Sequence, residues 1–186
     1  MSFEPTICKN VLDLTPEDII DKLLKFSNGI NVIWASPPCT QYSKARTQGG
    51  PRDLDGSDKI VQKVLDLAKY LVVPFCMENP QTGLLENQDV VKGIPVRVID
   101  YCSYADEAFP GRYRKRTGIW TNTNWMPARA ICKPSLCKFC SDGTKTRSCS
   151  PTESKNRTNA MEYNKFIYIY IVPPALPHEL IDYISG

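Results

Sequence analysis

Three short motifs contain side chains that could do chemistry, and each lies at the border of an apolar segment. Cys39 follows two prolines directly after the apolar segment 30–35. Glu78 closes a second apolar segment as part of Glu-Asn-Pro, and Arg114 and Arg116 precede a third. The loop after a buried strand is where an α/β enzyme would place a nucleophile, and a thiolate is a strong one. Together, the thiol, the carboxylic acid and the two guanidinium groups suggest chemistry on a nucleobase.

The segments around these motifs predict an α/β fold. Helices are expected from Pro16 to about Phe26 and from a cap at Ser57 to Leu71, with residues 41–55 as a loop between elements. Apolar and β-rich runs predict strands at 10–12 (a short strand end), 30–35, 73–77, 96–101, 119–121 and 166–172. Strands separated by helices imply a mainly parallel sheet that is covered on both faces.

Composition narrows the class of protein. A chain of 186 residues with 42% hydrophobic content can bury one substantial core. The net charge of +3 permits nucleic-acid binding without demanding it. No apolar stretch reaches the roughly 18 residues that span a bilayer, and the N-terminus lacks the apolar segment of a signal peptide. We therefore expect a soluble, intracellular protein whose eight cysteines serve catalysis, metal binding or burial rather than disulfides.

The three motifs resemble, in chain order, those of DNA (cytosine-5) methyltransferases. Residues 36–39, Ser-Pro-Pro-Cys, resemble the family's Pro-Cys nucleophile loop, residues 78–80 resemble Glu-Asn-Val, and residues 112–116 resemble Gln-x-Arg-x-Arg. The likeness is greatest to compact viral and phage-type members, which share Trp-Ala-Ser-Pro-Pro-Cys-Thr, Tyr-Arg-Lys-Arg-Thr and a terminal Pro-Pro-x-Leu, here residues 173–176. It covers nearly the whole chain and implies a viral or phage origin. Taken singly, a cysteine after prolines is more often a buried thiol, so the ordered combination carries the resemblance.

The resemblance implies a role for each reactive residue. The Cys39 thiolate would add to carbon 6 of a flipped-out cytosine, which makes carbon 5 reactive toward the methyl group of S-adenosylmethionine. Glu78 would hydrogen-bond ring nitrogen 3 and the exocyclic amine. Arg116 would hold the base carbonyl, while Arg114 would support the loop or a phosphate. Two further residues would support the Cys39 loop, Pro38 and Asn79.

The sequence departs from the family where the cofactor would bind. Asn10 stands where the family has an Asp for the adenine amine, Val11 would pack on adenine, and Pro37 would also border the cofactor. The family's Phe-x-Gly-x-Gly loop does not occur in the 186 residues. We therefore expect a truncated, Rossmann-like methyltransferase sheet without its first βαβ unit. The loop would have been removed, carried by a second polypeptide, or lost together with function.

A cysteine-rich segment at 122–163 predicts a small inserted subdomain between a catalytic core at 1–121 and a C-terminal strand and helix at 164–186. It contains four of the eight cysteines, which match a structural zinc knuckle because metal coordination can replace a core that so short a segment cannot build. The four are Cys132, Cys137, Cys140 and Cys149. The alternative is uncoordinated thiols. The segment stands where the family has its target-recognition region, and its lysines and arginines would contact DNA phosphates.

Two classes of function stay open at this point. The first is an enzyme, or a subunit of one, that methylates cytosine in DNA once a cofactor-binding segment is supplied. The second is a catalytically inactive protein of methyltransferase ancestry that binds nucleic acid or has a structural role. The presence of Cys39, Glu78 and Arg116 favours the first class, and the absent glycine loop favours the second.

Overall fold

The computed structural model describes residues 7–23, 32–44, 46, 49–104, 115–129, 131–133 and 175–185. The chain divides into two compact units, of which the first comprises Met1–Val96 with Ile119–Asn124 and the second Arg97–Gly118 with Trp125–Gly186. Helices and strands are mixed along the chain, as the α/β prediction requires. Within the described ranges, no helix is long and apolar enough to cross a membrane.

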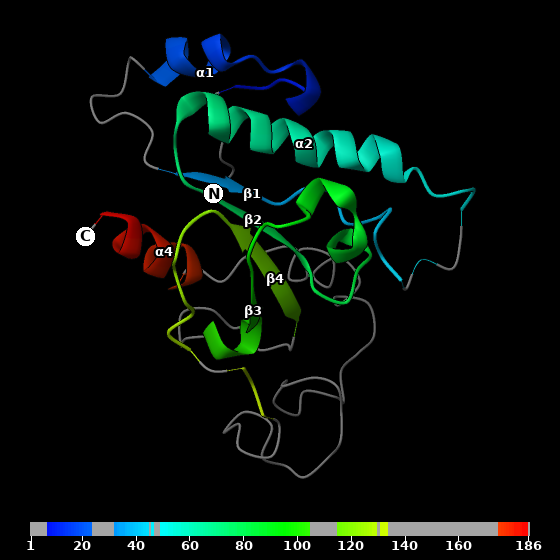
Figure 1. Cartoon of the computed structure of the whole chain (residues 1–186), viewed down its shortest axis with the longest axis vertical. Helices are drawn as coiled ribbons and strands as arrows, with labels where there is room; N and C mark the ends of the chain where they lie inside the picture. Colours follow the sequence, from blue (N-terminus) through cyan, green and yellow to red (C-terminus); the bar gives the residue numbers. More distant parts are fainter. Residues whose placement is uncertain are drawn as a thin grey trace, which may run out of the picture. The chain divides into compact units, whose positions relative to one another are not determined.

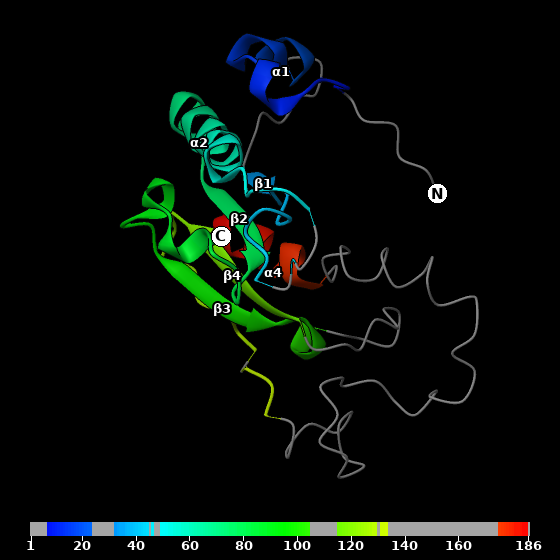
Figure 2. The same cartoon turned by 90° about the vertical axis from the view of Figure 1, so that its right-hand side faces the viewer.

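A pair of parallel strands forms the centre of the first unit. β1 (Ile33–Ala35) and β2 (Phe75–Pro80) pair with Ile33 opposite Phe75 and Ala35 opposite Met77. α2 (Leu54–Leu71) provides the crossover between them and lies along one side of the pair (Figures 1 and 2). Such a crossover is needed because two parallel strands cannot be joined by a tight turn. The predicted strands at 30–35 and 73–77 correspond to β1 and β2.

The amphipathic pattern of α2 explains the core of the first unit. Its buried apolar residues pack with side chains from the Cys39 loop, β2, the segment after β2, and β4. The fully packed cluster consists of Tyr42, Val61, Ala68, Phe75, Met77, Leu85, Val91 and Trp120. The helix begins about one turn before the predicted cap, because the Asp53 side chain accepts a hydrogen bond from the Gly56 amide at 2.8 Å. Ser57 lies inside the helix, so the prediction of a cap there was wrong.

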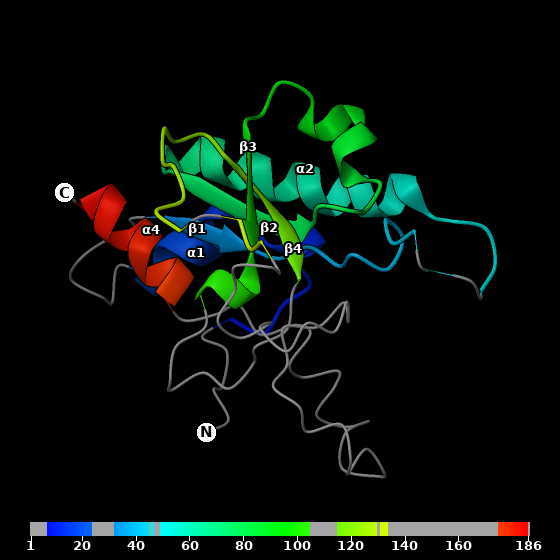
Figure 3. The same ribbon diagram turned by 90° about the horizontal axis from the view of Figure 1, so that it is seen from below.

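The two strands that follow β2 in the chain pair with each other in the antiparallel direction. β4 (Arg116–Thr121) lies between β2 and β3 (Val96–Asp100), which gives the sheet order β1-β2-β4-β3 (Figure 2; Figure 3 gives the view from below). The Thr121 amide donates to the Pro95 carbonyl and the Tyr101 amide donates to the Lys115 carbonyl, both at 3.1 Å. The first bond joins the end of β4 to the start of β3, and the second joins the start of β4 to the end of β3. The two strands are therefore antiparallel. The prediction of a mainly parallel sheet is therefore correct for the β1–β2 pair and wrong for β4, which runs antiparallel to β3.

The N-terminal segment forms two short helices next to α2. α1 (Pro16–Leu23) begins as predicted, because the Thr15 hydroxyl accepts from the Asp18 amide at 3.2 Å and the Asp18 carboxylate accepts from the Thr15 amide at 2.8 Å. η1 (Val11–Asp13) replaces the predicted strand end. Asn10 caps this turn by accepting a hydrogen bond from the Leu12 amide at 3.1 Å, which bends the backbone away from an extended strand.

One carboxylate organises the second unit. The Glu179 side chain, on α4 (Ala175–Ser185), accepts hydrogen bonds at one oxygen from the Tyr104 hydroxyl, the Trp125 ring nitrogen and the Ala128 amide, at 3.3, 3.2 and 3.0 Å. Tyr104 ends the short helix η4 (Tyr101–Tyr104) that follows β3. The predicted C-terminal helix is therefore present, and its Glu179 side chain is hydrogen-bonded to Tyr104 of η4. The predicted strand at 166–172 lies outside the described residues, as does most of the segment 122–163.

Candidate active site

The carboxyl ends of β1 and β2 meet at one edge of the sheet, and both predicted reactive residues of the first unit follow there. Because Ala35 pairs with Met77, the chain leaves the paired region toward Cys39 at the same edge where Glu78 continues β2. Open α/β sheets bind ligands at the carboxyl ends of their strands. Cys39 is half-buried, and Glu78 is 6% exposed. A thiol and a shielded carboxyl group therefore border the same sheet edge.

Asn79 connects β2 to the loop that carries Cys39. Its side-chain Nδ2 donates to the Pro37 carbonyl at 3.0 Å, and Asn79 and Pro37 are both buried. The Asn79 Oδ1 atom is also buried and has no hydrogen-bond partner among the described residues. A buried hydrogen bond from β2 to the backbone of the Cys39 loop is the contact that the predicted supporting role of Asn79 requires. Pro38, the other predicted support residue, is exposed.

A second anchor of the Cys39 loop is Tyr42, which the sequence analysis missed. Tyr42 is fully buried, its hydroxyl donates to Asp58 Oδ1 at 2.7 Å, and its carbonyl accepts from the Leu84 amide at 2.9 Å. Asp58 belongs to α2 and Leu84 follows β2, so Tyr42 holds the loop from two sides. A large aromatic residue within the otherwise polar segment 41–55 was the only signal in the sequence.

Gln41 extends this anchor toward the start of α2. Its carbonyl accepts from Arg52 Nη1 at 2.6 Å, and its side-chain oxygen accepts from Arg46 Nη1 at 2.8 Å and from the Asp53 amide at 3.1 Å. Three hydrogen bonds therefore join Gln41 to the polar segment that precedes the helix. Hydrogen bonds of Gln41 and Tyr42 therefore fix the backbone just after Cys39 to the start of α2 and to the segment after β2.

The Tyr42 hydroxyl makes stability depend on pH. Burial, followed by the adjacent Asp58 carboxylate, raises the pKa of Tyr42 well above its usual value of 10.0. The unfolded chain therefore releases this proton first, so its contribution to stability is complete below about pH 10 and declines as the pH rises further. We expect Tyr42→Phe to destabilise the fold by about 1 kcal/mol at pH 7 and to flatten the decline above pH 10, as measured by urea unfolding at both pH values.

Tyr70→Phe is the matched control for this measurement. The Tyr70 side chain is 58% exposed, and its hydroxyl donates to Glu17 at 3.3 Å on the surface. Its loss should change the free energy of unfolding by only a few tenths of a kcal/mol. Equal effects of Tyr42→Phe and Tyr70→Phe would contradict the proposed anchor.

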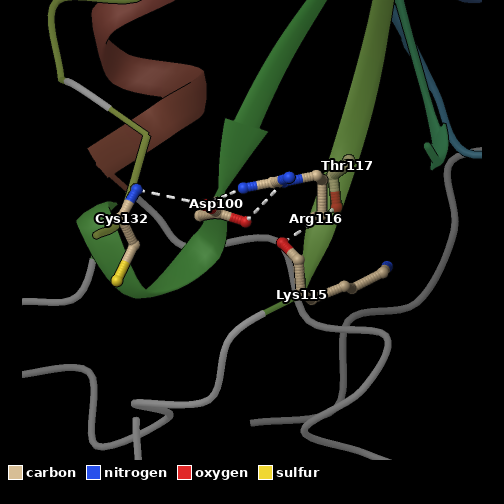
Figure 4. Close-up of polar contacts among 5 residues, drawn as sticks. All are labelled: Asp100, Lys115, Arg116, Thr117 and Cys132. Atoms are coloured by element: carbon tan, nitrogen blue, oxygen red, sulfur yellow. Dashed lines mark hydrogen bonds and ion pairs between the residues drawn. The ribbon is translucent and has the colours of Figure 1, made fainter. Parts of the chain in front are cut away.

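In the second unit, Arg116 is held by a buried carboxylate (Figure 4). Arg116 Nε donates to Asp100 Oδ1 at 3.3 Å, and Nη2 donates to Oδ2 at 3.2 Å. The Asp100 side chain is fully buried, whereas that of Arg116 is 35% exposed. The neighbouring Lys115 places its ammonium 4.9 Å from the centre of the Tyr101 ring. The sequence analysis did not identify Asp100, and Arg114 lies outside the described residues.

Only one predicted zinc ligand, Cys132, falls in the described part of the chain. It is buried, and its backbone amide donates to Asp100 Oδ2 at 3.0 Å. Cys137, Cys140 and Cys149 lie outside the described residues. Within the described ranges, no group of three or more His, Cys, Asp or Glu side chains could hold a metal ion. The zinc site therefore stays a prediction.

Metal analysis tests the zinc prediction directly. We expect protein purified without chelators to contain about one zinc ion per chain, and Cys137→Ser to lose the metal and unfold at lower temperature, since a structural zinc site contributes to folding. Cys8→Ser is the control, because Cys8 is exposed and distant in sequence from the insertion. A zinc-free protein whose stability is unchanged by Cys137→Ser would exclude the site.

The residues predicted to contact the cofactor lie in the first unit. Val11 is half-buried and keeps some apolar surface exposed, whereas Pro37 is buried and leaves little surface for a ligand. Asn10 is exposed, and its side-chain oxygen already accepts from the Leu12 amide, which leaves one lone pair for an adenine amine. Contact of these three residues with the adenine end of S-adenosylmethionine therefore stays a prediction. The glycine loop that would surround the methionine end does not occur in the 186 residues.

The fold and the candidate site together define a general class. The protein is an α/β protein in which a thiol and a shielded carboxyl group lie at the carboxyl ends of two parallel strands. No family model and no solved structure matches the chain. A curated protein from Frog virus 3 (isolate Goorha), described as a probable DNA (cytosine-5)-methyltransferase, is 31% identical over 168 residues. The match covers 82% of this chain and 74% of that protein. The chain therefore belongs to the compact viral type of the DNA (cytosine-5) methyltransferase family.

Proposed function

We propose that this protein transfers a methyl group from S-adenosylmethionine to carbon 5 of cytosine in DNA. The observation that best supports the proposal is the position of Cys39 and Glu78 at the shared carboxyl edge of β1 and β2. Membership of the viral methyltransferase family supports the same reaction. The anchored loop around Cys39 adds a physical reason, because a nucleophile must be held in place to attack a ring carbon.

Cys39 and Glu78 share the activation of the base in the proposed reaction. The Cys39 sulfur bonds to carbon 6 of a flipped-out cytosine, and the ring electrons that move toward carbon 5 make that carbon nucleophilic. Glu78 hydrogen-bonds ring nitrogen 3 and the exocyclic amine, which stabilises the charge of the adduct. The methyl group comes from bound S-adenosylmethionine, whose sulfonium makes it electrophilic. Loss of the carbon 5 proton then expels the Cys39 thiolate and restores the aromatic ring.

Basic residues complete the proposed contacts with DNA. Arg116 holds the carbonyl of the base, and Arg114 supports the catalytic loop or a phosphate. Lysines and arginines of the segment 122–163 contact the phosphate backbone, with a structural zinc ion organising that segment. Because the segment has about forty residues, it would read a short target or act with a partner.

The cofactor requires a contribution from outside the 186 residues. Asn10, Val11 and Pro37 would hold the adenine end, and the Phe-x-Gly-x-Gly loop would come from a longer chain or from a second polypeptide. The second candidate function is a catalytically inactive protein that binds nucleic acid. It is favoured by the absence of that glycine loop from the sequence.

A methyl-transfer assay separates these two functions. The purified chain is incubated with DNA and radiolabelled S-adenosylmethionine, alone and with a polypeptide that carries the glycine loop, and the product nucleosides are identified by mass spectrometry. Formation of 5-methylcytosine that depends on the added segment supports the proposed function. DNA binding without methyl transfer under both conditions would support the inactive alternative instead.

A further inference from the structure

Asp100 is a buried carboxylate at the end of β3, and the described residues place three hydrogen-bond donors around it. Arg116 contributes Nε and Nη2, at 3.3 and 3.2 Å, and the Cys132 backbone amide approaches Oδ2 at 3.0 Å (Figure 4). A fully buried carboxylate is costly unless it is paired and hydrogen-bonded. The folded protein therefore holds these donors in one fixed arrangement.

This arrangement uses only one side of the Arg116 guanidinium. The group is planar and has five N–H donors, of which Asp100 takes the Nε hydrogen and one Nη2 hydrogen. The second Nη2 hydrogen and both Nη1 hydrogens remain for another acceptor. Within the part of the chain that the structure describes, no residue forms a hydrogen bond with Nη1. The Arg116 side chain as a whole is 35% exposed, so part of it is accessible to a ligand.

We propose that Asp100 is a positioning residue for base recognition, which acts by presenting the Nη1 and Nη2 end of Arg116 to the carbonyl oxygen of the target cytosine. The inference rests on the proposed function, because it assigns Arg116 the base carbonyl as its ligand. A guanidinium held by its Nε side cannot turn about its own axis, so its free donors point in one direction. Lysine cannot replace it, since an ammonium group offers no such planar pair of donors.

The ion pair also separates base recognition from general attraction to DNA. An unpaired arginine beside DNA binds phosphate, and that contact is independent of sequence. Asp100 neutralises the charge of Arg116 and fixes its orientation, which makes a phosphate a poorer ligand and leaves a neutral carbonyl as a suitable one. Removing the carboxylate should therefore impair the reaction at the base while leaving affinity for DNA unchanged or higher. A merely structural residue would instead reduce both.

The experiment uses a duplex pool with random flanks and 5-azacytosine at one position. This ring accepts a thiolate without a methyl donor, because the Cys39 sulfur bonds to carbon 6, the electron pair of the ring double bond moves to nitrogen 5, and that nitrogen takes a proton. The rate of adduct formation at saturating DNA and the affinity for the unmodified pool are measured for wild type, Asp100→Asn, Arg116→Lys and the double variant. Asp100→Asn is isosteric and keeps an acceptor for the Cys132 amide.

We expect each single variant to form the adduct about tenfold more slowly, as for the loss of one hydrogen bond to a charged group, and the double variant to be no slower than Arg116→Lys. DNA affinity of Asp100→Asn should equal or exceed that of wild type. Wild-type adduct rates in Asp100→Asn, or multiplied losses in the double variant, would overturn the inference and leave the proposed function intact. A wild-type protein that forms no adduct, while still binding the pool, would overturn the proposed function itself.

A measurement on the wild-type protein keeps the inference testable if Asp100→Asn does not fold. The Nε–H signal of Arg116 is followed by nitrogen NMR, with and without the 5-azacytosine duplex. We expect a slowly exchanging signal that persists in the DNA complex, because Asp100 retains this hydrogen. Loss of its protection on DNA binding would show that DNA takes Arg116 away from Asp100, which contradicts the proposed positioning.

Discussion

We expect Cys39→Ser to abolish the covalent adduct between this protein and DNA that contains 5-fluorocytosine, in the presence of S-adenosylmethionine and a segment that carries the glycine loop. Fluorine at carbon 5 cannot leave as a proton does, so the reaction stops with the Cys39 sulfur still bonded to carbon 6. A serine hydroxyl is a far weaker nucleophile because it is not ionised near neutral pH. The adduct is measured as protein that remains bound to labelled DNA in a denaturing gel.

Cys8→Ser is the matched control for the trapping experiment. Cys8 is an exposed thiol, and its replacement should leave the amount of adduct unchanged. Persistence of the adduct in Cys39→Ser would mean that another thiol attacks the base, and the assignment of the catalytic loop would be wrong. DNA binding by the wild type without any adduct would support a binding protein that has lost catalysis.

The second large effect is expected at Glu78. Glu78→Gln keeps the shape of the side chain and can still hydrogen-bond ring nitrogen 3 and the exocyclic amine, but its amide cannot transfer a proton to the ring. We expect the single-turnover rate of adduct formation to fall by about 10²-fold or more, the usual size of an acid–base contribution. The affinity for DNA should change little, because Glu78 is only 6% exposed and acts on the base alone.

Glu86→Gln is the matched control, because it makes the same substitution at a carboxylate outside the candidate site. Glu86 is an exposed carboxylate on η2 (Leu85–Asn87), where it accepts from Gln81 at 3.4 Å. Its replacement should leave the rate unchanged. An adduct rate in Glu78→Gln equal to that of Glu86→Gln would exclude Glu78 from activation of the ring.

Local patterns were sufficient for the elements that present the site. The helix ending at Leu71 was predicted, and its apolar residues Val61, Val64 and Ala68 are buried on one face. The strand ends near Cys39 and Glu78 were predicted because apolar runs stop there. The start of α2 was misplaced because Asp53 and Ser57 are both good caps, and only the folded backbone decides between them.

The contacts that shape the site could not be predicted in the same way. Tyr42 and Asp58 are sixteen residues apart, as are Asp100 and Arg116, and no local pattern relates such partners. The antiparallel direction of β4 likewise depends on pairing with β3 rather than on its own sequence. At Asn10, a side-chain hydrogen bond with the Leu12 amide stabilises a turn where the apolar residues Val11 and Leu12 suggested a strand end. Long-range polar contacts and short ambiguous segments therefore account for what the sequence analysis missed.

The anchors of the Cys39 loop have a consequence for the order in which the molecule becomes functional during synthesis. Within the part of the chain that the structure describes, the hydrogen bonds that hold Pro37, Gln41 and Tyr42 from outside the loop come from residues later in the chain, between 46 and 84. A chain emerging from the ribosome therefore exposes its thiol before any of these partners exist, and folding of a domain proceeds as the later segments appear. The loop that carries the proposed nucleophile therefore gains these contacts only when the segment after β2 has been made, late in the synthesis of this part of the chain.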